Sequence, residues 1–302
     1  MRIRATVAAV TGALALSAVA APVATAAEPK VPANVAAALD AVAAADGTSA
    51  FATAAAGASY VLDASFSNVK VNSGKNVVVG TTATVKVPVS FTLTHGADVD
   101  IHAADFVAAV QLYRGESFGD SFSDFTSSDA TCTDSSATVA SCKATVAIDP
   151  FYLFNDDAAS WKAAAFAVAY NGEDPDDPDL DKVGVVVKDP TNSFRFQRLS
   201  QLTVNAAPEP VKKGKTITIT GKLTHANWDN SRYVGYGNQS VVLQFRKKGT
   251  TNYTNVKGIK TKTTGNLKTT VKASIDGYYR FQFKGTTATA PVTVAGDYVD
   301  VK

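Results

Sequence analysis

Six carboxylates crowd into nine residues near the middle of the chain, within the stretch NGEDPDDPDLDK from Asn171 to Lys182. Calcium takes about six to eight oxygen ligands, and aspartates can supply them. Pro175 and Pro178 stiffen the stretch, however, and it lacks the glycine that gives the helix–loop–helix calcium loop its sharp turn. A solvated acidic loop and an electrostatic contact with a basic partner are therefore the alternatives. The candidate calcium ligands are Asp174, Asp176, Asp177, Asp179 and Asp181.

A second possible metal site lies in DVDIHAAD, from Asp98 to Asp105. If this stretch is a strand, Asp98, Asp100 and His102 fall on one face of it, with Asp105 nearby. Carboxylates and an imidazole could bind a divalent ion there. A solvated outer face explains the same pattern, so both interpretations stay open.

One serine matches a hydrolase motif. GESFG, from Gly115 to Gly119, fits the G-x-S-x-G turn, which requires a strand before the serine and a helix after it. The residues that follow do not favour a helix, and the only histidine after Ser117 is His225, far along the chain. We therefore expect no catalytic residues, no enzymatic activity and no cofactor, with calcium as the one open question.

The basic residues concentrate in the last third of the chain. Residues 27–205 hold 11 Lys and Arg against 22 Asp and Glu, a net charge of −11, whereas residues 206–302 hold 16 against 5, a net charge of +11. A surface this basic attracts polyanions, although lysines also keep β-domains soluble and their edges unpaired. The strand pattern predicts one basic sheet face with Tyr278 among its members. The expected polyanion-binding residues are Arg246, Lys268, Lys272, Arg280 and Lys284.

The elements that must position these residues are strands. Apolar residues alternate with polar ones in TVKVPVSFTLTH, GKTITITGKLTH and GYYRFQFKG, which is typical of half-buried strands. Turn residues recur about every ten positions in the last third, as in sandwiches of two antiparallel sheets. SWKAAAFAVAYNG and KVGVVVKD are expected to pair as a hairpin whose loop is the acidic stretch. NAAPEPVKK, residues 205–213, is the expected hinge, because two close prolines cannot join a central strand.

The two cysteines, Cys132 and Cys142, are the only ones in the chain. In an exported protein such a pair predicts one disulfide. A loop this short contributes roughly 2–3 kcal/mol in the chain-entropy description.

The N-terminal residues predict export. Arg2 and Arg4 precede the uncharged apolar run from Ala5 to Ala21, and Ala24-Thr25-Ala26 supplies a cleavage pattern. We expect no transmembrane segment and a secreted, extracellular protein, or one loosely associated with the cell wall. The predicted parts are a signal peptide at 1–26, an Ala-rich leader at 27–56 that is a short helix or extended, an acidic β-sandwich with the disulfide at 57–205, and a basic sandwich at 206–302.

The C-terminal third also resembles a known module. PEPVKKGKTITITGKLTHANW, GYGNQSVVLQFRKKG and DGYYRFQFKG with AGDYVDV are similar to an immunoglobulin-like module found at the C-terminus of exported actinobacterial proteins. The resemblance implies fold and export and brings no catalytic residues. Together, the expectation is an all-β chain of two immunoglobulin-like β-sandwich domains in tandem after a signal peptide.

The function predicted from these features is non-enzymatic binding. The basic domain would adhere to an anionic cell-envelope polymer or polysaccharide, and nucleic acid is not the expected partner. The alternative is a self-associating extracellular surface or matrix protein that pairs its acidic and basic domains, with or without calcium. Adhesion of the basic domain to an anionic polymer should weaken with salt, because salt screens exposed charges.

Overall fold

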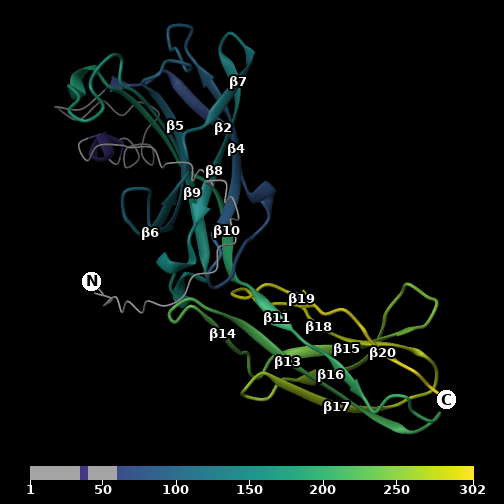
Figure 1. Cartoon of the computed structure of the whole chain (residues 1–302). Helices are drawn as coiled ribbons and strands as arrows, with labels where there is room; N and C mark the ends of the chain where they lie inside the picture. Colours follow the sequence, from purple (N-terminus) through teal and green to yellow (C-terminus); the bar gives the residue numbers. More distant parts are fainter. Residues whose placement is uncertain (1–34, 40–59) are drawn as a thin grey trace, which may run out of the picture.

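The structure is a computed structural model that describes residues 35–39 and 60–302 (Figure 1). The predicted signal peptide lies outside the described residues, as does the leader apart from 35–39, which are helical. No helix in the described part of the chain is long and apolar enough to cross a membrane.

The N-terminal strands are β1 Tyr60–Val61, β2 Ala64–Val71, β3 Val77–Val79, β4 Val85–His95, β5 Phe106–Gly115, β6 Ser121–Thr126, β7 Thr131–Ser136, β8 Val139–Ile148, β9 Ser160–Ala169 and β10 Gly184–Arg198. The C-terminal strands are β11 Ser200–Leu202, β12 Asn205–Ala207, β13 Thr216–Asn227, β14 Arg232–Gly235, β15 Ser240–Lys247, β16 Thr254–Lys260, β17 Asn266–Lys272, β18 Gly277–Phe283, β19 Val292–Thr293 and β20 Asp297–Val299.

The first sandwich packs a sheet of order β1-β10-β9-β5-β6, with β3 also on β10, against a sheet of order β2-β4-β8-β7. The period of two in β4 explains its place, because Val87, Val89, Phe91 and Leu93 all point into the core between the sheets. Four short 3-10 turns interrupt the strands: Asn72–Gly74, Pro150–Tyr152, Asn155–Asp157 and Leu180–Lys182.

The larger sheet of this sandwich is buried on both faces. Along β9, Ala163, Ala165 and Ala167 face the core between the sheets, whereas Phe166 and Val168 face a second apolar cluster on the other side. Val35 and Leu39, from the helical residues 35–39, belong to that second cluster. Strands buried on both faces read as continuous apolar runs, which explains why the β9 sequence shows no clear alternation.

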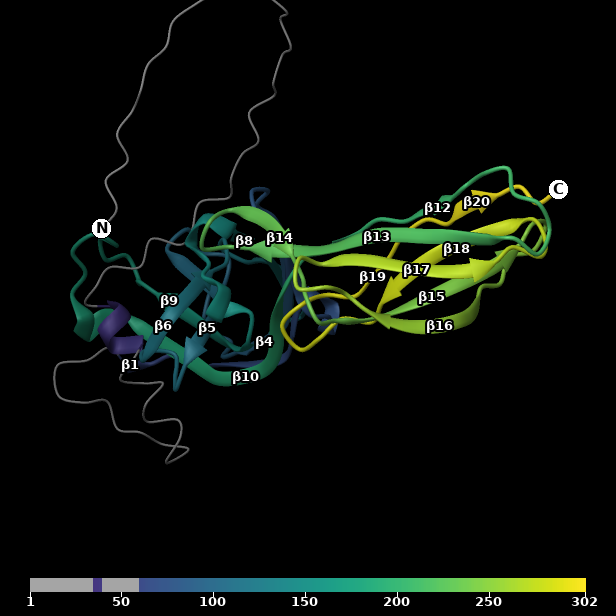
Figure 2. The same cartoon turned by 90° about the horizontal axis from the view of Figure 1, so that it is seen from below.

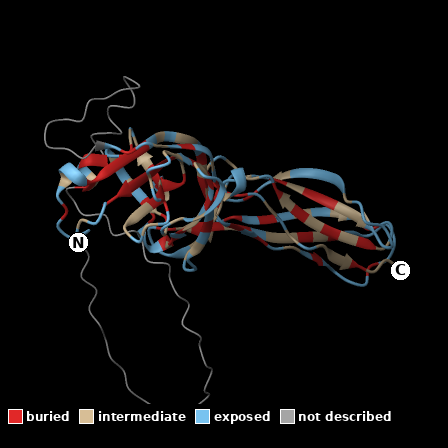
Figure 3. Ribbon diagram, turned by 90° about the horizontal axis from the view of Figure 1, so that it is seen from above, coloured by how far each residue is buried: buried red, intermediate tan, exposed pale blue. Residues whose placement is uncertain are grey.

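The second sandwich packs β13, with β11, β12, β14 and β17 paired to it, against a sheet of order β16-β15-β18-β19 with β20 also on β18. Its single core holds Ile217 and Ile219 from one sheet and Leu243, Phe281 and Phe283 from the other. Buried residues alternate with more exposed ones along these strands (Figure 3). The prediction of an all-β chain with two immunoglobulin-like sandwiches in tandem is confirmed.

The two sandwiches lie end to end, with the C-terminus at the far end of the second (Figure 2). Leu199 alone separates β10 of the first sandwich from β11 of the second. Trp228, in the loop after β13, packs into the core of the first sandwich and its Nε1 donates a hydrogen bond to the Gly80 carbonyl at 2.8 Å. The side-chain amide of Asn155 donates a hydrogen bond to Asn227 Oδ1 at 3.1 Å, and the backbone amide of Asn155 donates one to Asp229 Oδ1 at 3.0 Å. The junction is therefore packed and hydrogen-bonded.

The hinge predicted at residues 205–213 is wrong, and so is the domain boundary at 205. Leu202 pairs with Leu223, Ala206 pairs with Ile219, and both lie in the second core. Val211 forms a bridge with Val301. Pro208 and Pro210 follow β12 directly, beyond its last pairing with β13, so they do not interrupt a ladder. The chain changes sandwich at Leu199 instead.

Candidate polyanion-binding surface

The acidic stretch forms the loop between β9 and β10, as predicted, with the two strands paired in antiparallel register. Two of its six carboxylates form ion pairs with a lysine. Lys182 Nζ lies 2.9 Å from Glu173 Oε1 and 3.3 Å from Asp179 Oδ2. The hydrogen bond to Glu173, followed by that to Asp179, raises the pKa of Lys182.

Two of the candidate calcium ligands, Asp174 and Asp179, accept hydrogen bonds from nearby backbone amides. Asp174 accepts a hydrogen bond from the amide of Asp176 at 3.0 Å, and Asp179 accepts one from the amide of Asp181 at 3.3 Å. Among the described residues there is no group of three or more His, Cys, Asp and Glu side chains placed to hold a metal ion. The five aspartates, Asp177 included, therefore do not converge as a calcium cage in this structure, and the loop has the geometry of the solvated alternative.

The second possible metal site is not on a strand. Asp98, Asp100 and His102 lie in the turn between β4 and β5, because β4 ends at His95. The turn borders a cavity of about 390 Å³. The cavity lining includes Asp63, Asp98, Asp100, Asp105 and Asn171.

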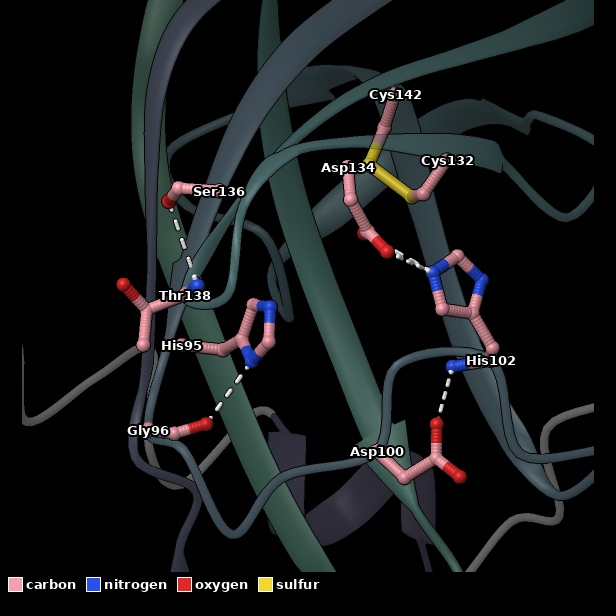
Figure 4. Close-up of polar contacts among 9 residues, drawn as sticks. All are labelled: His95, Gly96, Asp100, His102, Cys132, Asp134, Ser136, Thr138 and Cys142. Carbon is pink, nitrogen blue, oxygen red and sulfur yellow. Dashed lines mark hydrogen bonds and ion pairs between the residues drawn. A yellow bond between two sulfur atoms is a disulfide. The ribbon is translucent and has the colours of Figure 1, made fainter.

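His102 is engaged with the neighbouring hairpin (Figure 4). Its Nε2 lies 3.0 Å from both carboxylate oxygens of Asp134, and its amide donates to Asp100 at 2.9 Å. The same view shows the disulfide between Cys132 and Cys142, which face each other across β7 and β8. The predicted disulfide is confirmed, and it links the two strands of one hairpin.

Ser117 lies in the loop between β5 and β6, and a strand follows it where the hydrolase turn requires a helix. His225 lies on β13 of the other sandwich. The nucleophile, base and turn of a serine hydrolase are therefore not brought together here.

His225 instead belongs to the packing near the junction. Its ring stacks on Tyr236 with 4.1 Å between centroids and only 3° between planes, and it is 8% exposed. Burial, together with the nearby positive charge of Arg198, lowers the pKa of His225 to about 4. The imidazole is therefore neutral at pH 7.

The five predicted polyanion-binding residues do not share one sheet face, so that expectation is wrong. Lys268 and Lys272 lie on β17, which pairs with β13, whereas Arg246, Arg280 and Lys284 belong to the β15–β18 sheet or directly follow it. Because the two sheets turn their apolar faces toward each other, their outer faces point in opposite directions. The basic residues are spread over both outer faces of the sandwich.

The outer face of the β15–β18 sheet has a regular cross-strand order. Arg246 pairs with Tyr278, and Tyr278 pairs in turn with Tyr298 on β20. One step along the strands, Gln244 pairs with Arg280 on β18 and with Asn255 on β16. Side chains from four strands therefore meet on one surface.

The two arginines of this face are stacked on tyrosines. The guanidinium carbon of Arg246 lies 4.0 Å from the centroid of the Tyr278 ring and 5.3 Å from that of Tyr253, and that of Arg280 lies 3.6 Å from the Tyr253 ring. Cation–π contacts of this kind contribute about 0.5–1 kcal/mol at exposed sites. We call Arg246, Arg280, Tyr253 and Tyr278 the arginine–tyrosine cluster.

The residue pattern of the strands contains a partial signal for this cluster. Arg246, Tyr278 and Arg280 alternate with inward apolar residues and were predicted to point outward, which they do. Tyr253 was missed because it lies in the loop between β15 and β16 and reaches the face only when that loop folds back. Gly296 makes room for it, since a Cβ at that position would overlap the Tyr253 hydroxyl.

No family model matches this chain, and no curated protein sequence matches it. Solved structures with distant likeness include the adhesin InvE of Yersinia pseudotuberculosis (10% identity, TM-score 0.24), HBP35 of Porphyromonas gingivalis (10%, 0.27) and the ectodomain of mouse nectin-like molecule 4 (14%, 0.21). The alignments cover 78%, 79% and 80% of this chain and 58%, 63% and 65% of those chains, so this chain spans less than two thirds of each. At these TM-scores the likeness carries no argument about function.

Proposed function

We propose that the protein is a secreted, non-enzymatic binding protein whose C-terminal sandwich adheres to an anionic polymer of the cell envelope. The observation that carries this proposal is the uncompensated positive charge of residues 206–302. Of their 16 lysines and arginines, only Lys248 and Lys302 form an ion pair with a carboxylate of the described residues. The charge exceeds what solubility requires of a domain of this size.

The distribution of the charge supports a polymer as the partner. Lys268 and Lys272 are exposed on one outer face, and Lys284 is exposed on the opposite side. A long polyanion can contact both sides of a narrow sandwich, whereas a small anion would use one. Long-range attraction between the charged domain and the polymer would raise the association rate at low ionic strength.

The test is co-sedimentation of the chain from Ala27 to Lys302 with purified cell walls. We expect binding at about 0.05 M salt and little at about 0.5 M, because the screening length falls severalfold over that range. Walls stripped of their anionic polymers by mild acid are the control and should bind far less. Absence of sedimentation at low salt, or equal binding to stripped walls, would overturn the proposal.

The opposite charge of the two halves favours a second candidate, self-association. Residues 27–205 carry −11 and residues 206–302 carry +11, so the acidic half of one molecule could attract the basic half of another. Sedimentation velocity of the same chain without walls, at the same two salt concentrations, distinguishes the candidates. Oligomers at low salt that dissociate at high salt would favour self-association, and a monomer in both would exclude it.

A further inference from the structure

The arginine–tyrosine cluster holds two guanidinium groups that have no acidic partner. Neither Arg246 nor Arg280 forms an ion pair with any described carboxylate, whereas Lys248, which lies against Tyr298, pairs with Asp276 at 3.4 Å. Both arginines are only partly exposed, because tyrosine rings cover one side of each. Two positive groups are thus fixed side by side and remain electrostatically unbalanced.

The two arginines differ in how many of their hydrogen-bond donors the protein uses, and Arg280 uses the fewer. Arg280 donates through Nε to Gln244 at 2.8 Å. Arg246 donates through Nη1 to the carbonyl of Thr250 and also has side-chain hydrogen bonds to Tyr253 and Tyr278. For Arg280, the two terminal nitrogens have no hydrogen-bond acceptor among the described residues. A guanidinium carries five donors in a planar fork that matches the two oxygens of a carboxylate or phosphate. Stacking on a ring fixes the plane of that fork before any ligand arrives, so less side-chain entropy is lost on binding.

A row of amides continues the face beside the arginines. Gln244 donates to Asn255 at 2.9 Å and to Gln282 at 3.3 Å, and Gln282 donates to the hydroxyl of Thr293 at 3.4 Å. Amide and hydroxyl groups can both donate and accept hydrogen bonds. A ligand that lies across the sheet would meet oxyanion-binding groups first and then groups suited to hydroxyls.

We propose that the arginine–tyrosine cluster is a defined site for an acidic polysaccharide, in which Arg246 and Arg280 bind the carboxylate or phosphate groups and Asn255 and Gln282 bind neighbouring sugar hydroxyls. The buried Gln244 holds Arg280 in place beneath them. This inference rests on the proposed function and deepens it, because general attraction between charges needs no such geometry. It assigns the tyrosines a positioning role, since they hold the guanidinium planes.

The geometry favours a polysaccharide over single-stranded nucleic acid. Proteins that bind single strands stack the bases on aromatic rings. Here guanidinium groups already lie over Tyr253 and Tyr278, and Lys248 Nζ lies 5.2 Å from the centroid of the Tyr298 ring. On the ring faces that the cations cover, a base could stack only by displacing the cation.

The experiment measures binding of short oligosaccharides to the chain from Ala27 to Lys302 by calorimetry. A galacturonate oligomer supplies carboxylates, a phosphomannan oligomer supplies phosphates, and a neutral maltose oligomer is the control. We expect at least one acidic oligomer to bind and the neutral one not to bind. Failure of both acidic oligomers to bind would overturn the inference, even if cell walls sediment the protein.

The decisive variant keeps the charge and removes the fork. In Arg246→Lys/Arg280→Lys the net charge is unchanged, so general electrostatic attraction predicts unchanged affinity, whereas a fork site predicts a loss of about tenfold or more. Tyr253→Ala, which removes a stacked ring and no charge, should weaken binding by roughly threefold or more. Wild-type affinity in both variants would overturn the site and leave the proposed function standing.

The matched control removes charge elsewhere. Lys268→Gln/Lys272→Gln deletes two positive charges on the opposite outer face and should change the affinity for a short oligomer less than about threefold, because exposed charges at that distance are screened. Thermal melting verifies that every variant is folded. A short single-stranded DNA bound as tightly as the acidic oligomers, and weakened equally by the double Lys variant, would overturn the assignment to polysaccharide.

Discussion

The central strands of the two sandwiches, β9 and β18, are buried in different ways. Along β9 every residue from Ala163 to Val168 is buried, whereas along β18 each inward residue is followed by a partly exposed one. On the sheet of β9, the second face is covered by apolar residues that include Val35 and Leu39. On the sheet of β18, the second face carries arginine, tyrosine and amide side chains.

This difference separates a face used for stability from a face available for binding. The acidic half uses both faces of its larger sheet for packing, so neither face of that sheet is open to a partner. The basic half is stabilised by one core and leaves both outer faces to solvent. The arginine–tyrosine cluster is consistent with this division, since it adds ring stacking to an outer face without burying it.

The largest expected effect is a contrast in the free energy of unfolding between two neighbouring positions on β18, one inward and one outward. Phe281→Ala should lower the free energy of unfolding by about 3–5 kcal/mol, because Phe281 is fully buried in the only core of its sandwich. Gln282→Ala, one residue further and on the outer face, should cost about 0.5 kcal/mol or less. Urea unfolding of both variants measures the contrast. Equal losses of unfolding free energy would contradict the burial of only one face of β18.

In the acidic half, substitutions on the second, covered face of the larger sheet should also lower the free energy of unfolding. Leu39→Ala should lower the free energy of unfolding by about 2–4 kcal/mol, because Leu39 is 1% exposed within the second apolar cluster. The matched control is Ala37→Ser, an exposed position two residues earlier, for which we expect a change of about 0.5 kcal/mol or less. A Leu39 variant as stable as this control would show that residues 35–39 do not contribute to the covered face.

The smallest expected effect is a pH dependence that belongs to the basic half. The pKa of His225 is about 4 in the folded protein against 6.5 in the unfolded chain, so between these values the unfolded state binds more protons. Stability should therefore fall as the pH drops from 6.5 toward 4, by ~2–3 kcal/mol from this group. Urea unfolding at pH 7 and pH 4.5 measures it, and His225→Gln should show a smaller difference between the two pH values. An unchanged difference in the variant would assign the effect to carboxylates elsewhere.

Much of the local structure follows from residue patterns. The alternation of Val87, Val89, Phe91 and Leu93 predicted which side of β4 is buried, because side chains on a strand point alternately to its two faces. The pairing of β9 with β10 around the acidic loop was predicted from two apolar runs and the polar stretch between them. The disulfide followed from the presence of only two cysteines.

The errors share a physical cause, which is that sheet membership depends on contacts distant in sequence. The hinge at 205–213 was wrong because nothing local reveals that Ala206 pairs with Ile219 or that Val211 meets Val301. Among the alternatives left open for the acidic loop, the sequence did not reveal that Lys182, at the end of the loop, pairs with Glu173 and Asp179. Composition predicted the charges of that loop but not which of its charged side chains would pair with each other.

The amino-acid sequence by itself determined the β-class of the fold, the opposite charges of the two halves and the outward direction of Arg246, Tyr278 and Arg280. Each of these depends on composition or on the two-residue period of a strand. Only the tertiary structure decided that Lys268 and Lys272 lie on the opposite face and that Tyr253 reaches Arg280. Those facts depend on which sheet a strand joins and on how a loop folds over it, and both are set by packing between residues far apart in the chain.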